Sequence, residues 1–358
     1  RGRPDRPNAT LPATSRCGNR VPSWGTSPTR RCSGGTWRPG ASTSRPPTWT
    51  VPESGRTVPA RTPKAVVARL NQELTDERAK NAKTYKEAAP AIKYAFDALG
   101  DKHGWLVFGD EEYRNPKFKQ DTGRLTENMK QAAAKGPKLY CAVVSDNYAY
   151  VSVPFFGGQT QDQMTRFAQR IQDSLCKVVH PSTKGIIIDL RLNAGGNIYP
   201  MLAGLSNVLG SGDVSVNKDD KGKITERTSI ENNNVIQDGQ LRTSLGSSCG
   251  DLTQLPVAVL IGPITGSSGE GLALAFIGRT KTMLVGENTS GYTTANNGFL
   301  LAGDNYGMVL AENIMADRTG KQYPVHVKPG IEVIGGDDFF NHANDKKIQA
   351  ALSWLQRQ

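Results

Sequence analysis

The chain has 358 residues, enough for two modest domains or for one large domain with an accessory lobe. Its net charge is +11, but residues 1–60 hold ten Arg against two acidic residues, which leaves only +3 for residues 61–358. A nucleic-acid groove needs Lys and Arg clustered on folded elements and interleaved with aromatic residues. The sequence shows no such cluster, so we expect no nucleic-acid partner.

The first sixty residues differ from the rest of the chain. Pro, Gly, Ser, Thr and Arg dominate them, no apolar run is periodic, and no Lys occurs before Lys64. Such a composition cannot bury enough apolar surface to offset chain entropy, which predicts disorder. The abrupt change from Arg-only to Lys-rich usage also fits a spurious segment, read in the wrong frame or from a wrong start. Peptide mass spectrometry of the native protein distinguishes the two.

Targeting signals and metal-ligand patterns are missing from the sequence. No apolar run approaches the roughly 18 residues of a membrane span, and no signal peptide opens the chain. Localisation and oligomeric state therefore stay open. The five Cys lack metal-ligand spacing, so we expect no metal and no cofactor. Cys176 and Cys249 can pair in an oxidising compartment, but two free thiols are the favoured interpretation.

A helical lobe is expected next, over residues 61–100. Apolar residues from Val66 to Leu70 begin one amphipathic segment, and a second is predicted to open at Pro90 and to stop at Gly100. Residues 101–136 are predicted to form a loop and a short helix. We therefore expect a small N-terminal lobe over 61–136 and a core over 137–358.

Residues 137–358 alternate between strands and helices, which predicts a layered α/β core. A hairpin is expected from the runs LYCAVV and YAYVSV, and the polar stretch 210–254 is expected to supply strands or flaps around a cleft. Further strands are predicted at 185–193, 256–262, 282–287, 298–301 and 307–314. Helices are predicted at 161–179, 199–209, 268–279 and 345–355.

Two of the buried strands end in glycine-rich turns that run into helices, DLRLNAGGN and LIGPITGSSGEG. In open α/β sheets the ligand site lies beyond the carboxyl ends of such strands. Ser267 at a helix start is well placed as a nucleophile, because neighbouring amides can hold an oxyanion. The same residues also have a purely structural interpretation, in which Ser267 is a helix N-cap and the glycines permit tight turns. Taken alone, these residues favour the structural interpretation over catalysis.

Four motifs in this order, ALGDKHGW, GIIIDLRLNAGGN, ITGSSGEGLALAF and LVGENTSGYTTAN, resemble the tail-specific (C-terminal-processing) peptidase family. They are most similar to its His-dependent branch, and the likeness covers about residues 64–358. The resemblance implies a β/α spiral core like that of ClpP and the crotonases. It also implies a serine peptidase that cuts peptide or protein substrates, often near their C-termini, and suggests an extracytoplasmic (periplasmic or secreted) location.

The resemblance assigns roles residue by residue. Ser267 is the expected nucleophile and His103, in LGDKH, the expected general base; Tyr292 stands where the Lys-dependent branch has its base. A Tyr cannot replace that Lys, because its ordinary pKa near ~10 keeps it protonated. The remaining expected site residues are Ser268 with Gly195 or Gly196 for the oxyanion hole, Glu270 for orienting the imidazole or binding substrate, and Trp105 and Tyr292 for lining a peptide groove.

Two details temper these assignments. Glu270 lies in the first helical turn, where a carboxylate also stabilises the helix dipole, and the two roles are equally supported. Gly104 follows His103 where this branch usually has a Ser that supports the imidazole. The alternatives are therefore an inactive peptide- or ligand-binding relative and a crotonase-like acyl-CoA enzyme. Retained acyl-CoA activity in Ser267→Ala would favour the second.

Overall fold

The computed structural model describes residues 80–358 except 119–120, 146 and 301–305. The expected N-terminal segment 1–60 and the first amphipathic segment near Val66 lie outside these residues. No helix of the described part is long and apolar enough to cross a membrane.

The core is a mixed sheet with strand order β14-β11-β10-β5-β4-β3. All neighbours pair in parallel except β3 and β4, which form the predicted antiparallel hairpin. This arrangement confirms the predicted α/β class. The strands are β3 (Tyr140–Val144), β4 (Tyr148–Ser152), β5 (Gly185–Asp189), β10 (Val257–Ile261), β11 (Thr282–Gly286) and β14 (Ile331–Glu332).

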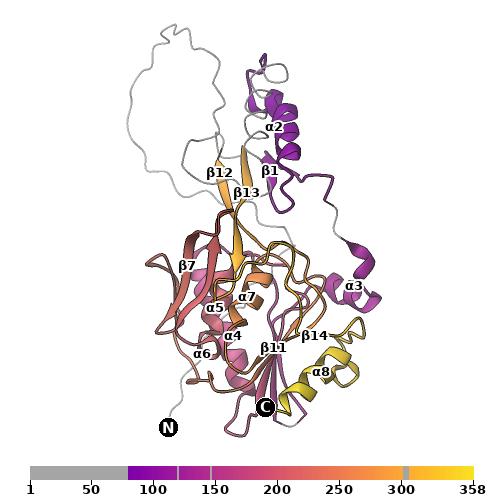
Figure 1. Cartoon of the computed structure of the whole chain (residues 1–358), viewed down its shortest axis with the longest axis vertical. Helices are drawn as coiled ribbons and strands as arrows, with labels where there is room; N and C mark the ends of the chain where they lie inside the picture. Colours follow the sequence, from indigo (N-terminus) through magenta and orange to yellow (C-terminus); the bar gives the residue numbers. More distant parts are fainter. Residues whose placement is uncertain (1–79, 119–120, 146, 301–305) are drawn as a thin grey trace, which may run out of the picture. The chain divides into compact units, whose positions relative to one another are not determined.

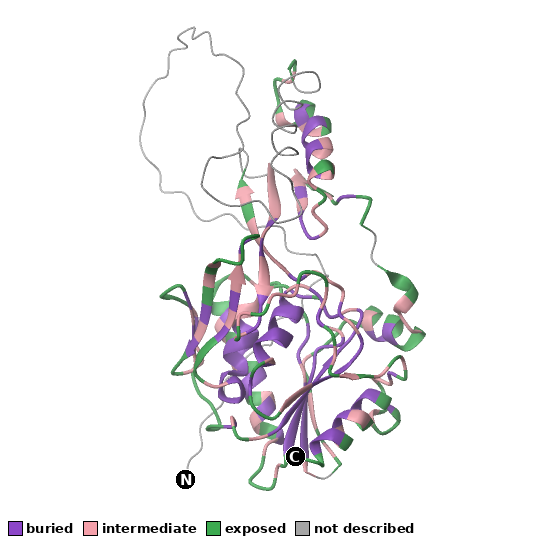
Figure 2. Cartoon of the chain, in the orientation of Figure 1, coloured by how far each residue is buried: buried purple, intermediate pink, exposed green. Residues whose placement is uncertain are grey.

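Helices cover both faces of this sheet (Figure 1). Ile186 and Ile188 of β5 pack on one face with α4, α5, α6 and α7, whereas Ile187 between them packs on the other face with α8. Strands buried on both faces read as continuous apolar runs, as GIIID and VAVLI do. Figure 2 shows the sheet buried between its helices. The helices are α3 (Glu127–Ala134), α4 (Gln161–Val178), α5 (Ile198–Gly204), α6 (Ser206–Leu209), α7 (Ser268–Phe276) and α8 (Lys346–Leu355).

A second sheet carries the order β2-β1-β13-β6-β7-β8-β9, with β12 pairing to β13. Its strand β13 pairs with β1 at its start and with β6 at its end, so one strand joins the lobe to the core. The polar stretch 210–254 supplies β6 to β9, as predicted. The strands are β1 (Trp105–Phe108), β2 (Glu111–Tyr113), β6 (Gly212–Lys218), β7 (Ile224–Glu231), β8 (Asn234–Gln237), β9 (Gln240–Thr243), β12 (Thr294–Leu300) and β13 (Tyr306–Ala316).

The lobe differs from its prediction in two ways. Helix α2 (Tyr85–Leu99) begins at Thr84, whose hydroxyl accepts from the Glu87 N–H, so Pro90 lies inside the helix and does not open it. Gly100 ends it in the left-handed conformation, as predicted. Residues expected to form a loop include β1 and β2, which pair with each other and with β13. The sequence did not predict β1 and β2, because they are only four and three residues long.

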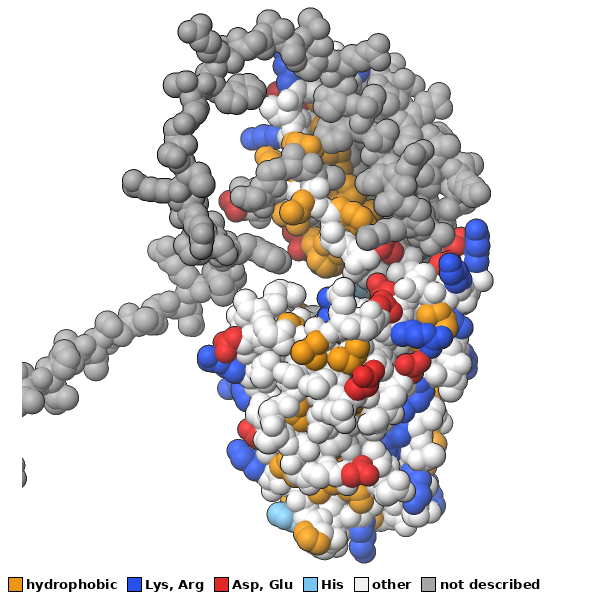
Figure 3. Space-filling model, turned by 90° about the vertical axis from the view of Figure 1, so that its left-hand side faces the viewer, with side chains coloured by type: hydrophobic (Ala, Val, Ile, Leu, Met, Phe, Trp, Pro, Cys, Tyr) orange, Lys and Arg blue, Asp and Glu red, His pale blue; other side chains and the backbone are white. Residues whose placement is uncertain are grey.

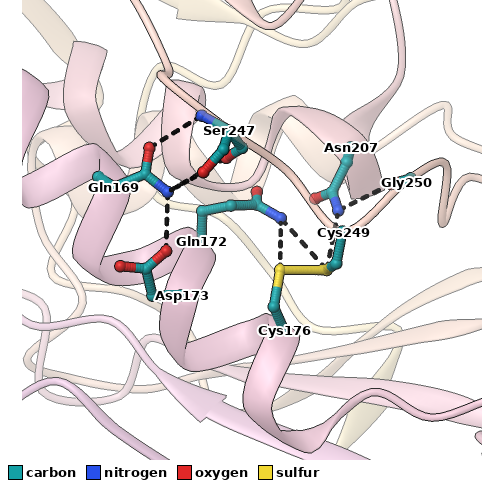
Figure 4. Close-up of a disulfide and its surroundings, with 8 residues drawn as sticks. All are labelled: Gln169, Gln172, Asp173, Cys176, Asn207, Ser247, Cys249 and Gly250. Carbon is teal, nitrogen blue, oxygen red and sulfur yellow. Dashed lines mark hydrogen bonds between the residues drawn. A yellow bond between two sulfur atoms is a disulfide. The ribbon is translucent and has the colours of Figure 1, made fainter.

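The expectation of free thiols at Cys176 and Cys249 is wrong. The two residues form a disulfide that ties α4 to the segment before β10, across 73 residues of sequence (Figure 4). The amide of Gln172, one turn earlier in α4, lies against both sulfur atoms. Sequence spacing could not decide this pairing, because it depends on how the 244–256 segment returns to the helix.

A buried ionic network fixes the turn that follows β5. The Arg191 guanidinium lies 2.6 Å from Asp189, 2.9 Å from Asp337 and 2.7 Å from Asp345, and all four side chains are almost completely buried. Burial alone raises the pKa of Asp189, but the Arg191 charge and its hydrogen bonds outweigh burial and lower that pKa. The network therefore joins the strand that precedes NAGG to the segment that leads into α8.

Removing Arg191 should destabilise the fold strongly. Arg191→Met leaves the buried carboxylates of Asp189 and Asp345 without their cation, while Asp337 keeps Lys347 at 2.7 Å. Breaking such buried pairs costs about 3–5 kcal/mol in the free energy of unfolding. Urea denaturation followed by circular dichroism measures it. Arg166→Met is the matched control, because Arg166 pairs with Asp162 on an exposed face and should matter little. Equal midpoints for both variants would contradict a structural role for the network.

Candidate active site

Ser267 occupies a strained backbone position between β10 and α7. Its φ of 51° and ψ of −120° match the first central residue of a type II′ turn, which is normally Gly. Ser267 stands at the N-cap position of α7, but its angles differ from the β-region angles usual there, and its side chain makes no direct cap hydrogen bond. A non-Gly residue in such a conformation costs about 1–3 kcal/mol and persists where its side chain is needed.

The structure brings the two glycine-rich turns together, as predicted. The Gly266 N–H donates to the Asn193 carbonyl at 3.0 Å, and a methyl group added at Gly195 would lie 2.7 Å from Ser267 Cβ. Only glycine at 195 permits this approach. The carboxyl ends of the neighbouring parallel strands β5 and β10 thus deliver both turns to one place.

Two backbone N–H groups of the paired turns, those of Gly196 and Ser268, have no acceptor among the described residues. The third expected amide, at Gly195, is occupied, because it donates to Asn193 Oδ1 at 2.9 Å. The Ser268 hydroxyl donates to the Gly196 carbonyl and so fixes the two turns relative to each other. The arrangement favours Gly196 over Gly195 as the first turn's contribution to an anion site.

Glu270 is completely buried beneath this turn. Its carboxylate accepts from the N–H groups of Ser267 at 2.9 Å, Gly291 at 2.9 Å and Tyr292 at 2.8 Å, and from the Thr289 hydroxyl. Burial raises the pKa of Glu270, while these donors act in the opposite direction. The carboxylate therefore joins the Ser267 turn to segment 289–292, and no bond from it to His103 occurs among the described residues.

His103 is buried at the end of a tight loop between α2 and β1. Its N–H and that of Gly104 donate to Asp101 Oδ1 at 2.8 and 2.9 Å, and Asp101 Oδ2 accepts from the Ala311 N–H of β13 at 2.8 Å. Burial lowers the pKa of His103 to about 4, against the opposing effect of Asp101. The imidazole is therefore neutral near pH 7, the state required of a proton acceptor.

The imidazole is held by a residue that the sequence did not single out. Thr294 Oγ1 lies 2.8 Å from His103 Nδ1, and the same hydroxyl lies 3.3 Å from Asn296 Oδ1. Because Asn296 Oδ1 can only accept, the hydroxyl donates to it and accepts from Nδ1–H. This tautomer leaves Nε2 as an acceptor. Both residues lie within the motif GENTSGYTTAN, the only signal that could have identified them.

Gly104 is required by close packing. A methyl group there would lie 2.5 Å from Asp101 Oδ2 and 2.6 Å from the Val309 carbonyl. A Ser at this position would displace the carboxylate that anchors the His103 loop. This chain therefore has Gly104 where the His-dependent branch usually has a Ser, and the Thr294 hydroxyl supports the imidazole instead.

Tyr292 lies between the two halves of the site. Its ring is 5.2 Å from the His103 ring, and its Cδ2 lies 3.5 Å from where a methyl at Gly266 would stand. No hydrogen bond joins His103 to Ser267 among the described residues. The Trp105 ring packs against the Arg114 guanidinium at 4.6 Å, on β1 of the lobe.

Ser267→Gly should fold at least as stably as the unaltered chain, because glycine adopts the observed φ without strain. Ser267→Ala keeps the strain and should not gain stability. Thermal denaturation of both variants measures the difference, which we expect to favour Gly by about 1 kcal/mol or more. A Gly variant less stable than the Ala variant would argue against strain at this position.

Thr294→Val should release the His103 tautomer, because Nδ1–H loses the hydroxyl that accepts from it. Nitrogen-15 NMR of labelled histidine reports the tautomer. Thr293→Val is the control: Thr293 is the more buried of the two neighbours, and its hydroxyl has no partner among the described residues. An Nε2–H signal for His103 in the unaltered protein would contradict the assignment.

Comparisons with known proteins agree with this geometry. Residues 147–333, just over half of the chain, match the model of peptidase family S41. The nisin-resistance protein of Lactococcus lactis subsp. lactis is 29% identical over 287 residues, which make up 79% of this chain and 78% of that protein.

Two solved structures share the fold. A lipoprotein from Streptococcus agalactiae aligns with a TM-score of 0.60 at 20% identity, over 85% of this chain and 92% of that one. The photosystem II D1 C-terminal processing protease aligns with a TM-score of 0.52 at 13% identity, over 78% and 89%. The resemblance seen in the four motifs is thereby confirmed, and the chain belongs to peptidase family S41.

Proposed function

We propose that the chain is a serine peptidase that hydrolyses peptide bonds through an acyl-enzyme, with Ser267 as nucleophile and His103 as general base. Family membership supports peptidase chemistry. The observation that carries the residue assignment is the strained Ser267 beside two unpaired amides, those of Gly196 and Ser268. No cofactor or metal takes part in the proposed reaction.

The geometry supports each half-reaction. His103 Nε2 takes the proton of the Ser267 hydroxyl as Oγ attacks the scissile carbonyl, and the amides of Gly196 and Ser268 bind the oxyanion. The imidazolium then gives the proton to the leaving amine, and the C–N bond breaks. Water repeats the sequence on the ester, which releases the acid and restores Ser267.

The proposal requires movement at the junction of lobe and core. The Tyr292 ring contacts the His103 ring and approaches Gly266, and no hydrogen bond joins His103 to Ser267 among the described residues. Catalytic hydrogen bonds are often longer in the free enzyme and tighten when substrate binds. We assign Tyr292 to substrate contact at this junction, Trp105 to the lobe wall of the groove, and Glu270 to holding Ser267 in place.

The same gap between His103 and Ser267 also favours a second candidate, a relative that binds peptides without turnover. Against it stand the neutral imidazole and its correct tautomer, which a binding protein does not need. Labelling by a fluorophosphonate distinguishes the two, because only an activated Ser267 reacts.

The substrates we propose are peptides or proteins cut near their C-termini, in an extracytoplasmic compartment. The Cys176–Cys249 disulfide supports that compartment, because disulfides form and persist in oxidising surroundings. Only the forty residues 100–139 separate α2 from β3, too few for an inserted peptide-binding domain. Substrate selection is therefore assigned to the groove and to strands β6–β9, on the β/α spiral core that the family resemblance implies.

Fluorophosphonate should label the unaltered chain, and Ser267→Ala should abolish labelling. His103→Ala should lower kcat/KM on a peptide substrate by at least about a thousandfold.

Since burial lowers the pKa of His103 to about 4, kcat/KM should hold down to about pH 5 and fall near pH 4. An acid limb centred at pH 6.5, or labelling that survives Ser267→Ala, would refute the assignment.

A further inference from the structure

One amide side chain connects the backbone of His103 to its own imidazole. Asn296 Nδ2 donates to the His103 carbonyl at 3.2 Å, and Asn296 Oδ1 lies 3.3 Å from Thr294 Oγ1. That hydroxyl lies 2.8 Å from His103 Nδ1, so the contacts leave His103 at its carbonyl and return to it at its imidazole. We call these three contacts the Asn296–Thr294 bridge. No carboxylate takes part in it.

The direction of each hydrogen bond in the bridge follows from the carbonyl. A carbonyl oxygen can only accept, so the amide nitrogen of Asn296 faces the His103 backbone and the amide oxygen faces Thr294. An amide oxygen also only accepts, so the Thr294 hydroxyl gives its hydrogen to Asn296 and offers a lone pair to Nδ1 of His103. Nδ1 therefore carries the hydrogen, and the backbone of His103 dictates the tautomer of its own side chain.

A β-bulge places Asn296 beside the anchor of the His103 loop. The register of β12 and β13 shifts at Asn296, which pairs with Ala311, whereas an unbroken ladder would pair it with Glu312. The Ala311 N–H donates to Asp101 at 2.8 Å and so fastens the loop that carries His103. Bulges re-aim side chains and are common beside active sites. The shift thus brings the Asn296 amide to the level of the His103 carbonyl.

We propose that Asn296 is a positioning residue for catalysis, which selects the tautomer of His103 through Thr294. This inference rests on the proposed function and adds a residue that acts through others. When His103 takes the proton of Ser267, Nε2 gains it, while Nδ1–H stays bonded to the Thr294 hydroxyl. The imidazole therefore keeps its orientation throughout proton transfer, which is the task of the carboxylate in a Ser-His-Asp triad.

The bridge orients the imidazole without adding a charge. Among the charged neighbours of His103, Asp101 raises its pKa, whereas Arg114 and Lys102 lower it. On the described part of the face that Figure 3 shows, basic and acidic side chains are interspersed, so that face adds no large field of one sign. A carboxylate in place of the Asn296 amide would be a new charge close to the imidazole, and it should raise the pKa of His103.

Asn296→Ala tests tautomer selection on the full chain. Without the amide oxygen, the Thr294 hydroxyl can donate to Nδ1, which favours the tautomer with hydrogen on Nε2. That form cannot accept the Ser267 proton. Nitrogen-15 NMR of labelled histidine should therefore show His103 changing from the Nδ1–H to the Nε2–H form. On a peptide substrate kcat should fall about tenfold or more, with little change in KM.

A second substitution separates tautomer selection from structural support. When Thr294→Val is added to Asn296→Ala, no hydroxyl remains to hold the wrong tautomer. We expect kcat of the double variant to exceed that of Asn296→Ala by about threefold, a coupling typical of residues in one hydrogen-bond network. A structural contribution alone predicts the opposite, because removing two supports costs more than removing one.

Asn296→Asp gives an independent readout. Its carboxylate still accepts from the Thr294 hydroxyl, so His103 should keep hydrogen on Nδ1, while the new charge raises the pKa of the imidazole. The acid limb of kcat/KM should therefore move upward by about one pH unit or more. Asn297→Ala is the matched control, since Asn297 follows on β12 and donates to Glu312. It should leave the tautomer, kcat and the acid limb unchanged.

Three results would overturn the proposal: an Nδ1–H form of His103 that persists in Asn296→Ala, a double variant slower than Asn296→Ala, or an acid limb that stays in place in Asn296→Asp. Failure of the proposed function is recognised separately. In that case the unaltered protein cuts no peptide and is not labelled by fluorophosphonate, whereas failure of the inference alone leaves labelling and cleavage by the unaltered protein intact.

Discussion

The buried Glu270 carboxylate is the interaction on which the rest of the site depends. It accepts from the backbone of Ser267 on one side and of Tyr292 on the other, so the strained turn and segment 289–292 move as one unit. Thr294, two residues further on, then holds the His103 imidazole. A single carboxylate in the first turn of α7 thereby links the expected nucleophile to the support of the expected base, although it touches no imidazole itself.

The base reaches this unit from a different part of the chain. His103 sits on a loop that Asp101 fastens to β13, and β13 runs within the second sheet from its pairing with β1 to its pairing with β6. The lobe and the core are thus joined by one continuous strand.

Local patterns predicted most of the core from sequence. Apolar runs with glycine-rich ends, GIIID and VAVLI, predicted two adjacent parallel strands and the meeting of their turns, because carboxyl ends of such strands share one edge. The lobe was predicted less well: Pro90 suggested a helix start, but the Thr84 cap sets it. Thr294 and the disulfide escaped prediction since each depends on contacts across more than seventy residues. The sequence left Gly195 and Gly196 as alternative sources of the oxyanion-hole amide. The structure favours Gly196, because the Gly195 N–H already donates to Asn193 Oδ1.

The most direct measurement of the central claim is a crystal structure of the chain reacted with a peptidyl phosphonate. The account predicts a bond from phosphorus to Ser267 Oγ, with one phosphoryl oxygen about 2.7–3.1 Å from the amides of both Gly196 and Ser268. It also predicts His103 Nε2 within about 3.2 Å of Oγ or of the leaving-group position. A phosphonate attached elsewhere, or an oxygen directed away from those two amides, would contradict it.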